Sequence, residues 1–191
     1  MKLHHYLFFL IVVFSMIAVT SCQTEEQPQK AELTQEELIA RGKYIVSTSG
    51  CHDCHTPKKM TEQGPVPDEN YLLAGHPADM PIPSYDKNIV REWALFSHTM
   101  TAVVGPWGVS FSANITSDGT GIGNWTYDQF KTAMTKGLYK GLEGSRPIMP
   151  PMPWQEFKNY TDEDLRAIFE YLKSTPPVQN VPPAYIPPDQ M

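Results

Sequence analysis

Cys51, Cys54 and His55 form the one C-x-x-C-H segment of the sequence. Two thiols at this spacing can add to the two vinyl groups of one porphyrin, and the adjacent histidine can then reach the iron from one face of the ring. The segment therefore predicts one covalently attached haem c, with thioether bonds to Cys51 and Cys54 and with His55 as an iron ligand. Such an iron exchanges single electrons or binds small ligands, depending on its sixth ligand.

Three other uses of a C-x-x-C pair fit the sequence less well. A thioredoxin-like dithiol needs a preceding strand in a βαβ context, and no such pattern is visible before Cys51. A zinc site needs two further ligands at matched spacing, and the sequence has neither a second C-x-x-C nor a His-x-x-x-His segment. A disulfide across two intervening residues would close a small, strained loop with little entropic gain. Haem attachment is the favoured interpretation.

The sixth ligand of the iron decides between an electron carrier and a site that binds oxygen, peroxide or other small molecules. His76, His98 and several methionines are candidates. Met149 and Met152 lie in the segment Arg146-Pro-Ile-Met-Pro-Pro-Met-Pro-Trp154, whose prolines hold the backbone extended and remove amide donors. A thioether presented in this way can point steadily at an iron, although the residues alone do not separate Met149 from Met152.

The amino terminus has the features of an export signal. Residues 6–19 are almost uninterruptedly apolar, too short for an ordinary membrane span and typical of a signal-peptide core. The following Val19-Thr20-Ser21-Cys22 resembles the bacterial lipobox, in which the cysteine is lipidated and the signal is cut before it. The resemblance implies that Cys22 is the lipid attachment site and that several acyl chains give stable anchoring. We therefore expect a lipoprotein signal peptide over residues 1–21 and a flexible polar tether over residues 22–32.

Three helix starts carry the same signature, a capping threonine followed three positions later by a residue that can cap in return. The pairs are Thr34 with Glu37, Thr126 with Gln129, and Thr161 with Asp164. The pattern predicts a first helix over residues 35–47 that leads to the C-x-x-C-H segment. The two later helices have apolar residues at i, i+3, i+4 and i+7. These residues are Phe130, Ala133, Met134 and Gly137 in one helix, and Leu165, Ile168, Phe169 and Leu172 in the other.

The rest of the chain is rich in proline and glycine. About seventy residues between the first and second helices have little periodicity, so we expect a long loop there. Within it, residues 90–96 fit either a strand or a single helical turn. Repeated proline pairs after Lys173 predict an extended tail. The net charge is −6, which leaves no basic stripe to neutralise phosphates and argues against nucleic acid as a partner.

Several motifs together resemble one family. They are Arg41-Gly42-Lys43-Tyr44, the C-x-x-C-H segment, Asn114-Ile115-Thr116, Thr120-Gly121-Ile122-Gly123-Asn124-Trp125-Thr126, Met152-Pro153-Trp154, Thr161-Asp162-Glu163-Asp164-Leu165 and Tyr171-Leu172-Lys173. Over residues 33–183 they are similar to class I cytochromes c. They resemble in particular the cytochrome c domains of membrane-bound alcohol and gluconate dehydrogenase cytochrome subunits, and related stand-alone monohaem cytochromes.

The resemblance implies an all-α fold, a class I cytochrome c-like domain with a long proline- and glycine-rich loop insertion. The domain would span residues 33–183, and residues 184–191 would form an extended tail. In class I cytochromes the first and last helices cross closely. Gly42 is therefore implied to admit an aromatic side chain from the last helix, either Phe169 or Tyr171.

The resemblance also implies roles for single residues. The methionine of Met-Pro-aromatic is the axial ligand in that family, which favours Met152 and leaves Met149 as the second choice. A carbonyl near Gly64-Pro65 is implied to accept the ring N–H of His55. His76 lies in a stretch similar to the family and is interpreted as structural.

The expected function is single-electron transfer by one haem with His/Met ligation. The protein is expected to be lipid-anchored in the bacterial cell envelope, outside the inner membrane, either in the periplasm or at the outer membrane. The chain is expected to be an electron carrier rather than an enzyme, without catalytic residues. Its expected partners are redox proteins, a dehydrogenase or a terminal oxidase, and the membrane. Two alternatives stay open: a haem enzyme or sensor with a displaceable sixth ligand, peroxidase-like or gas-binding, and an anchored cytochrome subunit of a dehydrogenase or oxidase complex. Dehydrogenase subunits of the family carry three haem motifs, and this sequence has one.

Overall fold

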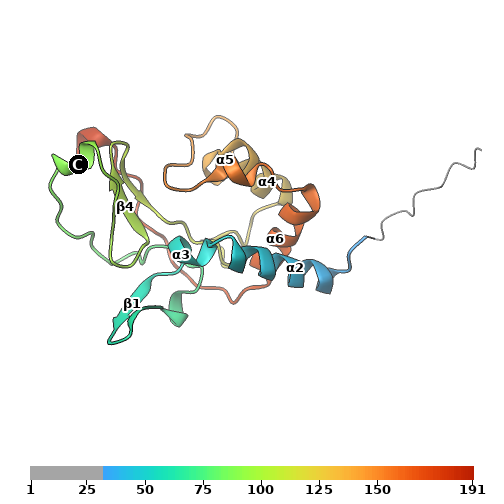
Figure 1. Ribbon diagram of the computed structural model, residues 1–191. Coiled ribbons are helices and arrows are strands. Elements are labelled where there is room, and N and C mark those ends of the chain that lie inside the picture. The colour runs from blue at the N-terminus through green and yellow to red at the C-terminus, as the bar shows by residue number, and fades with distance from the viewer. Residues whose placement is uncertain (1–31) are drawn as a thin grey trace, which may run out of the picture. The chain divides into compact units, whose positions relative to one another are not determined.

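In the computed structural model the described part of the chain is residues 32–191 (Figure 1). The expected signal peptide, the lipid attachment site Cys22 and the tether up to residue 31 lie outside the described residues. Among the helices of residues 32–191, none is long and apolar enough to cross a membrane.

Three helices begin at the predicted capping residues. They are α2 (Gln35–Thr48), α4 (Tyr127–Lys136) and α6 (Asp162–Ser174), which follow Thr34, Thr126 and Thr161. Each threonine hydroxyl accepts a hydrogen bond from the amide three positions later, which satisfies one of the free amides of the first turn. At Thr34, the carboxylate of Glu37 also accepts from the threonine amide at 2.8 Å. These predicted helix starts are confirmed.

The helices α2 and α6 pack closely against each other (Figure 1). A Cβ atom at Gly42 of α2 would lie 1.9 Å from the carbonyl oxygen of Ala167 and 2.7 Å from the Cβ of Tyr171. The aromatic partner expected for Gly42 is therefore Tyr171 rather than Phe169. The tightest contact is with the backbone of Ala167, so the glycine permits two helix backbones to touch.

The larger apolar core joins these helices to the segment that connects α3 (Cys51–His55) with α4. α2, α4 and α6 supply most of it, and Leu73 and Ile122 come from the connecting segment. All the predicted apolar positions of α4 and α6 are buried, and all but Ala133 and Gly137, the C-cap of α4, belong to this core. The buried members are Ile45, Val46, Leu73, Ile122, Phe130, Met134, Leu165, Ile168, Phe169 and Leu172.

The connecting segment contains strands, so the expectation of an all-α fold is wrong. β1 (Lys58–Thr61) and β2 (Gly64–Pro67) form an antiparallel pair, and a second antiparallel sheet has the order β3-β4-β5. The strands of this second sheet are β3 (Leu95–Phe96), β4 (Ala102–Gly105) and β5 (Gly108–Phe111). The segment also holds two single turns of 3-10 helix, η1 (Glu69–Tyr71) and η2 (Ile89–Arg91). The undecided residues 90–96 thus contain both the end of a helical turn and a strand.

The β4–β5 hairpin forms because β-branched residues flank a short turn. Val103 and Val104 pair across the hairpin with Ser110 and Val109, and Pro106-Trp107 make the turn between the strands. Gly105 and Gly108 flank this turn, and Gly108 has a φ of 109°, which favours glycine. Because these glycines and the proline break the run of β-branched residues, the sequence alone does not predict the two strands.

The chain after α6 packs back onto the second sheet. Ile186 and Val109 of β5 exchange backbone hydrogen bonds of 2.8 and 3.0 Å. The side chain of Asn180 donates to the carbonyl groups of Ala74 and His76, at 2.7 and 2.9 Å. The last 3-10 turn, η4 (Pro188–Gln190), lies beside β5 (Figure 1). The tail is therefore tied to the connecting segment by backbone and side-chain bonds. Two short helical elements, η3 (Tyr139–Gly141) and α5 (Trp154–Phe157), complete the fold.

Candidate haem site

The C-x-x-C-H segment forms the short helix α3, directly after α2 (Figure 1). Cys51, Cys54 and His55 stand at i, i+3 and i+4, and this spacing places their side chains on one face of a helix. His55 is buried, and the two cysteines are partly buried with free thiols. Gly50 precedes α3 in the left-handed conformation, with a φ of 71°, and lets the chain turn out of α2.

The ring of His55 is oriented by a backbone carbonyl. Its Nδ1 lies 2.7 Å from the carbonyl oxygen of Ala113. Because a carbonyl only accepts hydrogen bonds, Nδ1 carries the proton and Nε2 carries the lone pair. Burial lowers the pKa of His55, and the hydrogen bond to Ala113 opposes this shift. The imidazole is thus held neutral, with Nε2 in the form that ligates a metal.

The expectation that a carbonyl near Gly64-Pro65 accepts from His55 is wrong. Those two residues begin β2, in the hairpin that follows the motif, while the acceptor comes 58 positions after His55. Ala113 follows β5, so the second sheet determines where this carbonyl lies.

Gly75 allows Ala113 to come close to His55. Its φ is 77°, and a Cβ atom at this position would lie 2.3 Å from the carbonyl oxygen of Ser112 and 2.5 Å from the carbonyl group of Ala113. The amide of Gly75 also donates to the carbonyl of His55 at 2.8 Å. Gly75 therefore touches both the helix that carries His55 and the strand end that orients its ring.

Lys58 caps the carboxyl end of α3. Its Nζ donates to the carbonyl oxygens of His52 at 2.8 Å, Asp53 at 3.3 Å and Thr56 at 2.6 Å. Burial lowers the pKa of Lys58, and the nearby Asp53 opposes this shift. A cation is favourable at a helix C-terminus, where carbonyl groups lack partners. The motif thus carries a positive charge fixed to its own helix.

The acidities of the two thiols do not fit a redox dithiol. Burial raises the pKa of Cys51 to about 11, and burial together with Asp53 also raises the pKa of Cys54. Thiol–disulfide enzymes need a lowered thiol pKa, because the thiolate is the nucleophile. The zinc alternative also lacks support, since residues 32–191 contain no group of three or more His, Cys, Asp or Glu side chains that could hold a metal ion.

The two candidate methionines differ in their surroundings. Both are partly buried, but Met152 packs against the larger apolar core, as Cys51 also does. Met149 does not belong to that set of contacts. The ring of Trp154, two residues after Met152, lies over Gly137, where a Cβ atom would be 2.3 Å from the indole. The structure therefore brings Met152 and the C-x-x-C-H helix to one apolar cluster.

The two histidine candidates for the sixth ligand lie in other surroundings. His76 is buried, and its Nδ1 and Nε2 lie 2.9 Å from the Thr101 hydroxyl and 2.9 Å from the Met80 carbonyl. Both ring nitrogens thus have protein partners, which supports the structural interpretation of His76. His98 is exposed beside the β3–β4 turn.

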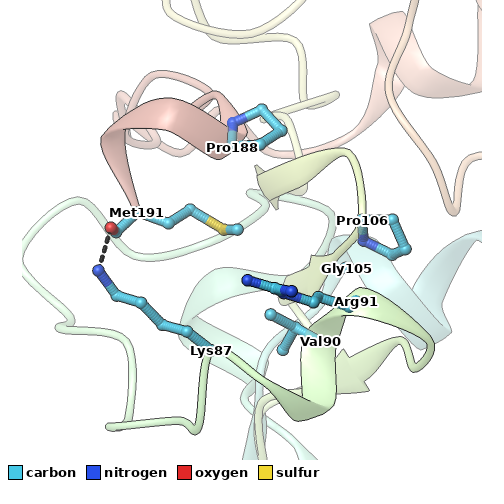
Figure 2. Close-up of a pocket in the computed structure, with 7 residues that line it drawn as sticks. All are labelled: Lys87, Val90, Arg91, Gly105, Pro106, Pro188 and Met191. Atoms are coloured by element: carbon cyan, nitrogen blue, oxygen red, sulfur yellow. Dashed lines mark hydrogen bonds between the residues drawn. The ribbon is translucent and has the colours of Figure 1, made fainter.

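The pocket drawn in Figure 2 lies away from the motif. It has a volume of about 240 Å³ and is lined from the connecting segment and the tail, by Lys87, Val90, Arg91, Gly105, Pro106, Pro188 and Met191. None of the predicted haem or iron ligands contributes to it.

Comparison with known proteins decides the family. The model of the family described as cytochrome c matches residues 39–176, which include the C-x-x-C-H helix, the methionine segment and α6. The chain belongs to the cytochrome c family. A domain of this family implies covalently bound haem c.

Bacterial relatives of this cytochrome c include dehydrogenase subunits. Over 165 residues, or 86% of the chain, it is 39% identical to the cytochrome c subunit of a quinone-dependent alcohol dehydrogenase from Gluconacetobacter polyoxogenes. The corresponding subunit from Gluconobacter oxydans is 31% identical over 143 residues, or 74% of the chain. A nicotinate dehydrogenase subunit from Pseudomonas putida is 39% identical over 80 residues, or 41% of the chain. The matches cover 26%, 22% and 6% of the three relatives, so the chain spans about a quarter of their length or less.

The residues of this cytochrome c fit the group that the family implies. Two free thiols and a neutral, buried imidazole share one face of α3, and its carbonyl partner leaves Nε2 with its lone pair. The adjoining cluster is apolar, as a porphyrin face requires. Cys51, Cys54 and His55 are thus the residues that would hold haem c.

Three residues that contribute to the site were not found from the sequence. Ala113 acts through its backbone, Gly75 through the absence of a side chain, and Lys58 through a cap on α3. Only the lysine three positions after the motif carried a local signal, since a basic residue just past a helix end is a common cap.

Proposed function

We propose that this cytochrome c is a single-electron carrier with one haem c, held by Cys51 and Cys54 and ligated by His55 and Met152. The observation that carries the proposal is the geometry of His55. Its Nδ1 donates to Ala113 at 2.7 Å, which leaves Nε2 with its lone pair on a helix that also bears both thiols. The haem would supply an iron that cycles between two oxidation states.

The residues of the chain would keep that cycle free of ligand exchange. The hydrogen bond from His55 fixes the orientation of the imidazole and raises its basicity. The apolar core beside Cys51 and Met152 limits access of water. A thioether in the sixth position closes the site to small molecules and favours the reduced form. The packing of Met152 on this core supports it over Met149 as the sixth ligand.

The test is the reaction of the reduced, haem-loaded protein with carbon monoxide. The unchanged chain should bind it only slowly and partially, whereas Met152→Ala should bind it rapidly and stoichiometrically because the sixth position is open. Met149→Ala is the matched control and should behave as the unchanged chain. Rapid stoichiometric binding by the unchanged protein would refute the carrier and favour a gas-binding or peroxidase-like haem. A disturbance caused only by Met149→Ala would reassign the ligand.

A dehydrogenase is the partner that we propose. Relatives of the chain are named as cytochrome subunits of alcohol, fructose and gluconate dehydrogenases. These names support a dehydrogenase as the electron donor and this chain as the acceptor. The chain matches less than a third of each, so it would be either a separate carrier or one subunit of a complex. Gel filtration of detergent extracts distinguishes the two, because a separate carrier should elute near its own mass.

We further propose that the chain is lipid-anchored at Cys22 in the bacterial cell envelope. The apolar segment over residues 6–19 and the lipobox-like sequence before Cys22 support this. Cys22→Ser should move the haem protein from the membrane fraction to the soluble periplasmic fraction. The proposed lipid attachment would be refuted if Cys22→Ser stayed in the membrane fraction and the amino-terminal peptides of the variant and the unchanged protein differed in mass only by the substitution.

A further inference from the structure

The segment over residues 149–153 carries both candidate methionines, and it has few ways to be held in place. Pro150, Pro151 and Pro153 have no backbone N–H, so the segment can be fixed mainly through its carbonyl groups. The carbonyl groups of Met152 and Pro153 accept hydrogen bonds from residues of α5, the helix that follows directly. These bonds are local and do not join the segment to the rest of the fold.

Ser110 of β5 supplies a connection from a distant element. Its Oγ lies 2.6 Å from the carbonyl oxygen of Pro150, which directly follows Met149 and lies two positions before Met152. Within residues 32–191, this is the one hydrogen bond that joins residues 149–153 to an element other than α5. Ser110 is 8% exposed, so little water can replace its hydroxyl as the partner of Pro150.

The hydroxyl of Ser110 is oriented by Trp107 in the β4–β5 turn. The indole Nε1 donates to Oγ of Ser110 at 3.3 Å, which leaves the hydroxyl proton for a carbonyl acceptor. Pro150, at 2.6 Å, is a closer acceptor than Val103, at 3.3 Å. The indole lies over Gly105, where a Cβ atom would be 2.6 Å from the ring. Its position is therefore fixed by the hairpin.

A second contact joins the same turn to the start of the methionine segment. The hydroxyl of Tyr185 donates to the carbonyl of Trp107. The guanidinium of Arg146 lies 3.9 Å from the ring centre of Tyr139 and 5.3 Å from that of Tyr185. The hairpin and the tail thus hold the chain both at Arg146 and at Pro150, on either side of Met149.

We propose that Ser110 is a positioning residue whose hydrogen bond to Pro150 keeps Met152 on the iron. The inference rests on the proposed function, because it takes Met152 as the sixth ligand. Without the hydroxyl, Pro150 loses its partner, and the segment can move away from β5 more readily. The fraction of molecules with an open sixth position should then rise about twofold to tenfold, which corresponds to the loss of one ordinary hydrogen bond.

The experiment compares Ser110→Ala with Ser112→Ala in the haem-loaded full chain. Ser112 lies two positions further along, its side chain makes no hydrogen bond within residues 32–191, and it serves as the matched control. One readout is the absorption band of methionine-ligated ferric haem, and the other is the fraction of reduced protein that binds carbon monoxide at a fixed low concentration. Ser110→Ala should weaken the band and raise the bound fraction about twofold to tenfold. Trp107→Phe, which removes the Nε1 donor, should do the same to a smaller extent.

Met152→Ala in the same series separates failure of this inference from failure of the proposed function. If Met152→Ala opens the site while Ser110→Ala and Trp107→Phe match the unchanged protein, Ser110 does not position the segment, and the ligand assignment stands. If Met152→Ala leaves both readouts unchanged, the ligand assignment fails, and the inference fails with it. A lower melting temperature of Ser110→Ala with an unaltered band and unaltered binding would make its role structural only. That outcome would also overturn the inference.

Discussion

Replacing Gly75 by alanine should disturb the site through the backbone of its neighbours. The new Cβ atom would lie 2.3 Å from the carbonyl oxygen of Ser112 and 2.5 Å from the carbonyl carbon and oxygen of Ala113. Non-bonded carbon and oxygen atoms normally stay about 3.3 Å apart or more. The backbone over residues 112–113 would therefore have to retreat by up to about an ångström. That movement would lengthen the 2.7 Å hydrogen bond between Ala113 and His55.

The cost of this change has two parts, and the chain offers a control for one of them. Gly75 has a φ of 77°, and an alanine in this conformation is strained by about 1–2 kcal/mol, which the lower freedom of the unfolded chain offsets by about 0.4–1 kcal/mol. Gly144 has nearly the same φ, 79°, with nothing within 4 Å of its Cβ position. Gly144→Ala should therefore cost only about 1 kcal/mol. Gly75→Ala adds the clash, about 1–3 kcal/mol, for a total of about 2–4 kcal/mol.

Urea unfolding of the two haem-loaded variants measures the difference. With a typical slope of about 2 kcal/mol per molar urea, the midpoint of Gly75→Ala should fall about 1 M below that of Gly144→Ala. The reduction potential gives a second readout. A weaker bond to Ala113 makes the imidazole of His55 a poorer donor to oxidised iron, so the potential should rise, by at most about 60 mV. Equal midpoints and equal potentials for the two variants would refute the reasoning.

Two further substitutions test the helices that carry the motif. Gly42→Ala should lower the melting temperature by about 2–8 °C, because its Cβ atom would lie 1.9 Å from the backbone of Ala167, and this clash outweighs the roughly 1 kcal/mol gained in helix propensity. A higher melting temperature of the variant would contradict it. Lys58→Met should destabilise the haem-loaded protein by about 1–2 kcal/mol and lower its reduction potential, because α3 loses its cap and a nearby positive charge. The control is Lys59→Met, which removes the ion pair between the exposed Lys59 and the partly buried Asp68, and equal effects of the two substitutions would argue against a special role for Lys58.

The helices and the motif could be predicted because their signals are local. A capping threonine and its partner lie three positions apart, and Cys51 to His55 span little more than one turn of helix. Both patterns follow from the periodicity of the helix and need no information on the rest of the chain. The strands of the connecting segment were missed for the opposite reason. They are two to four residues long, and glycine stands at the ends of β4 and β5, so pairing between strands decides them and their own sequence does not.

The contacts that complete the candidate site are long-range. The partner of His55 lies 58 positions away, and the one distant partner of Pro150 lies 40 positions away. Ala113 contributes a backbone carbonyl, which every residue has, and Ser110 contributes a hydroxyl found throughout the sequence. Neither residue type identifies its contact in the sequence. For His55, the folded sheet and the close approach of Gly75 to it decide which carbonyl accepts the hydrogen bond of the imidazole.

The sequence by itself determined that two thiols and a histidine share a helical face, that a proline-bracketed methionine segment precedes the last helix, and where the main helices begin. The physical reason is that covalent spacing and helix geometry act within a few residues of each other. Only the tertiary structure decided that the imidazole is held by Ala113, that Met152 rather than Met149 packs on the core beside Cys51, and that Ser110 bonds the methionine segment. Those choices depend on close packing between elements far apart in the chain, where a shift of an ångström exchanges one partner for another.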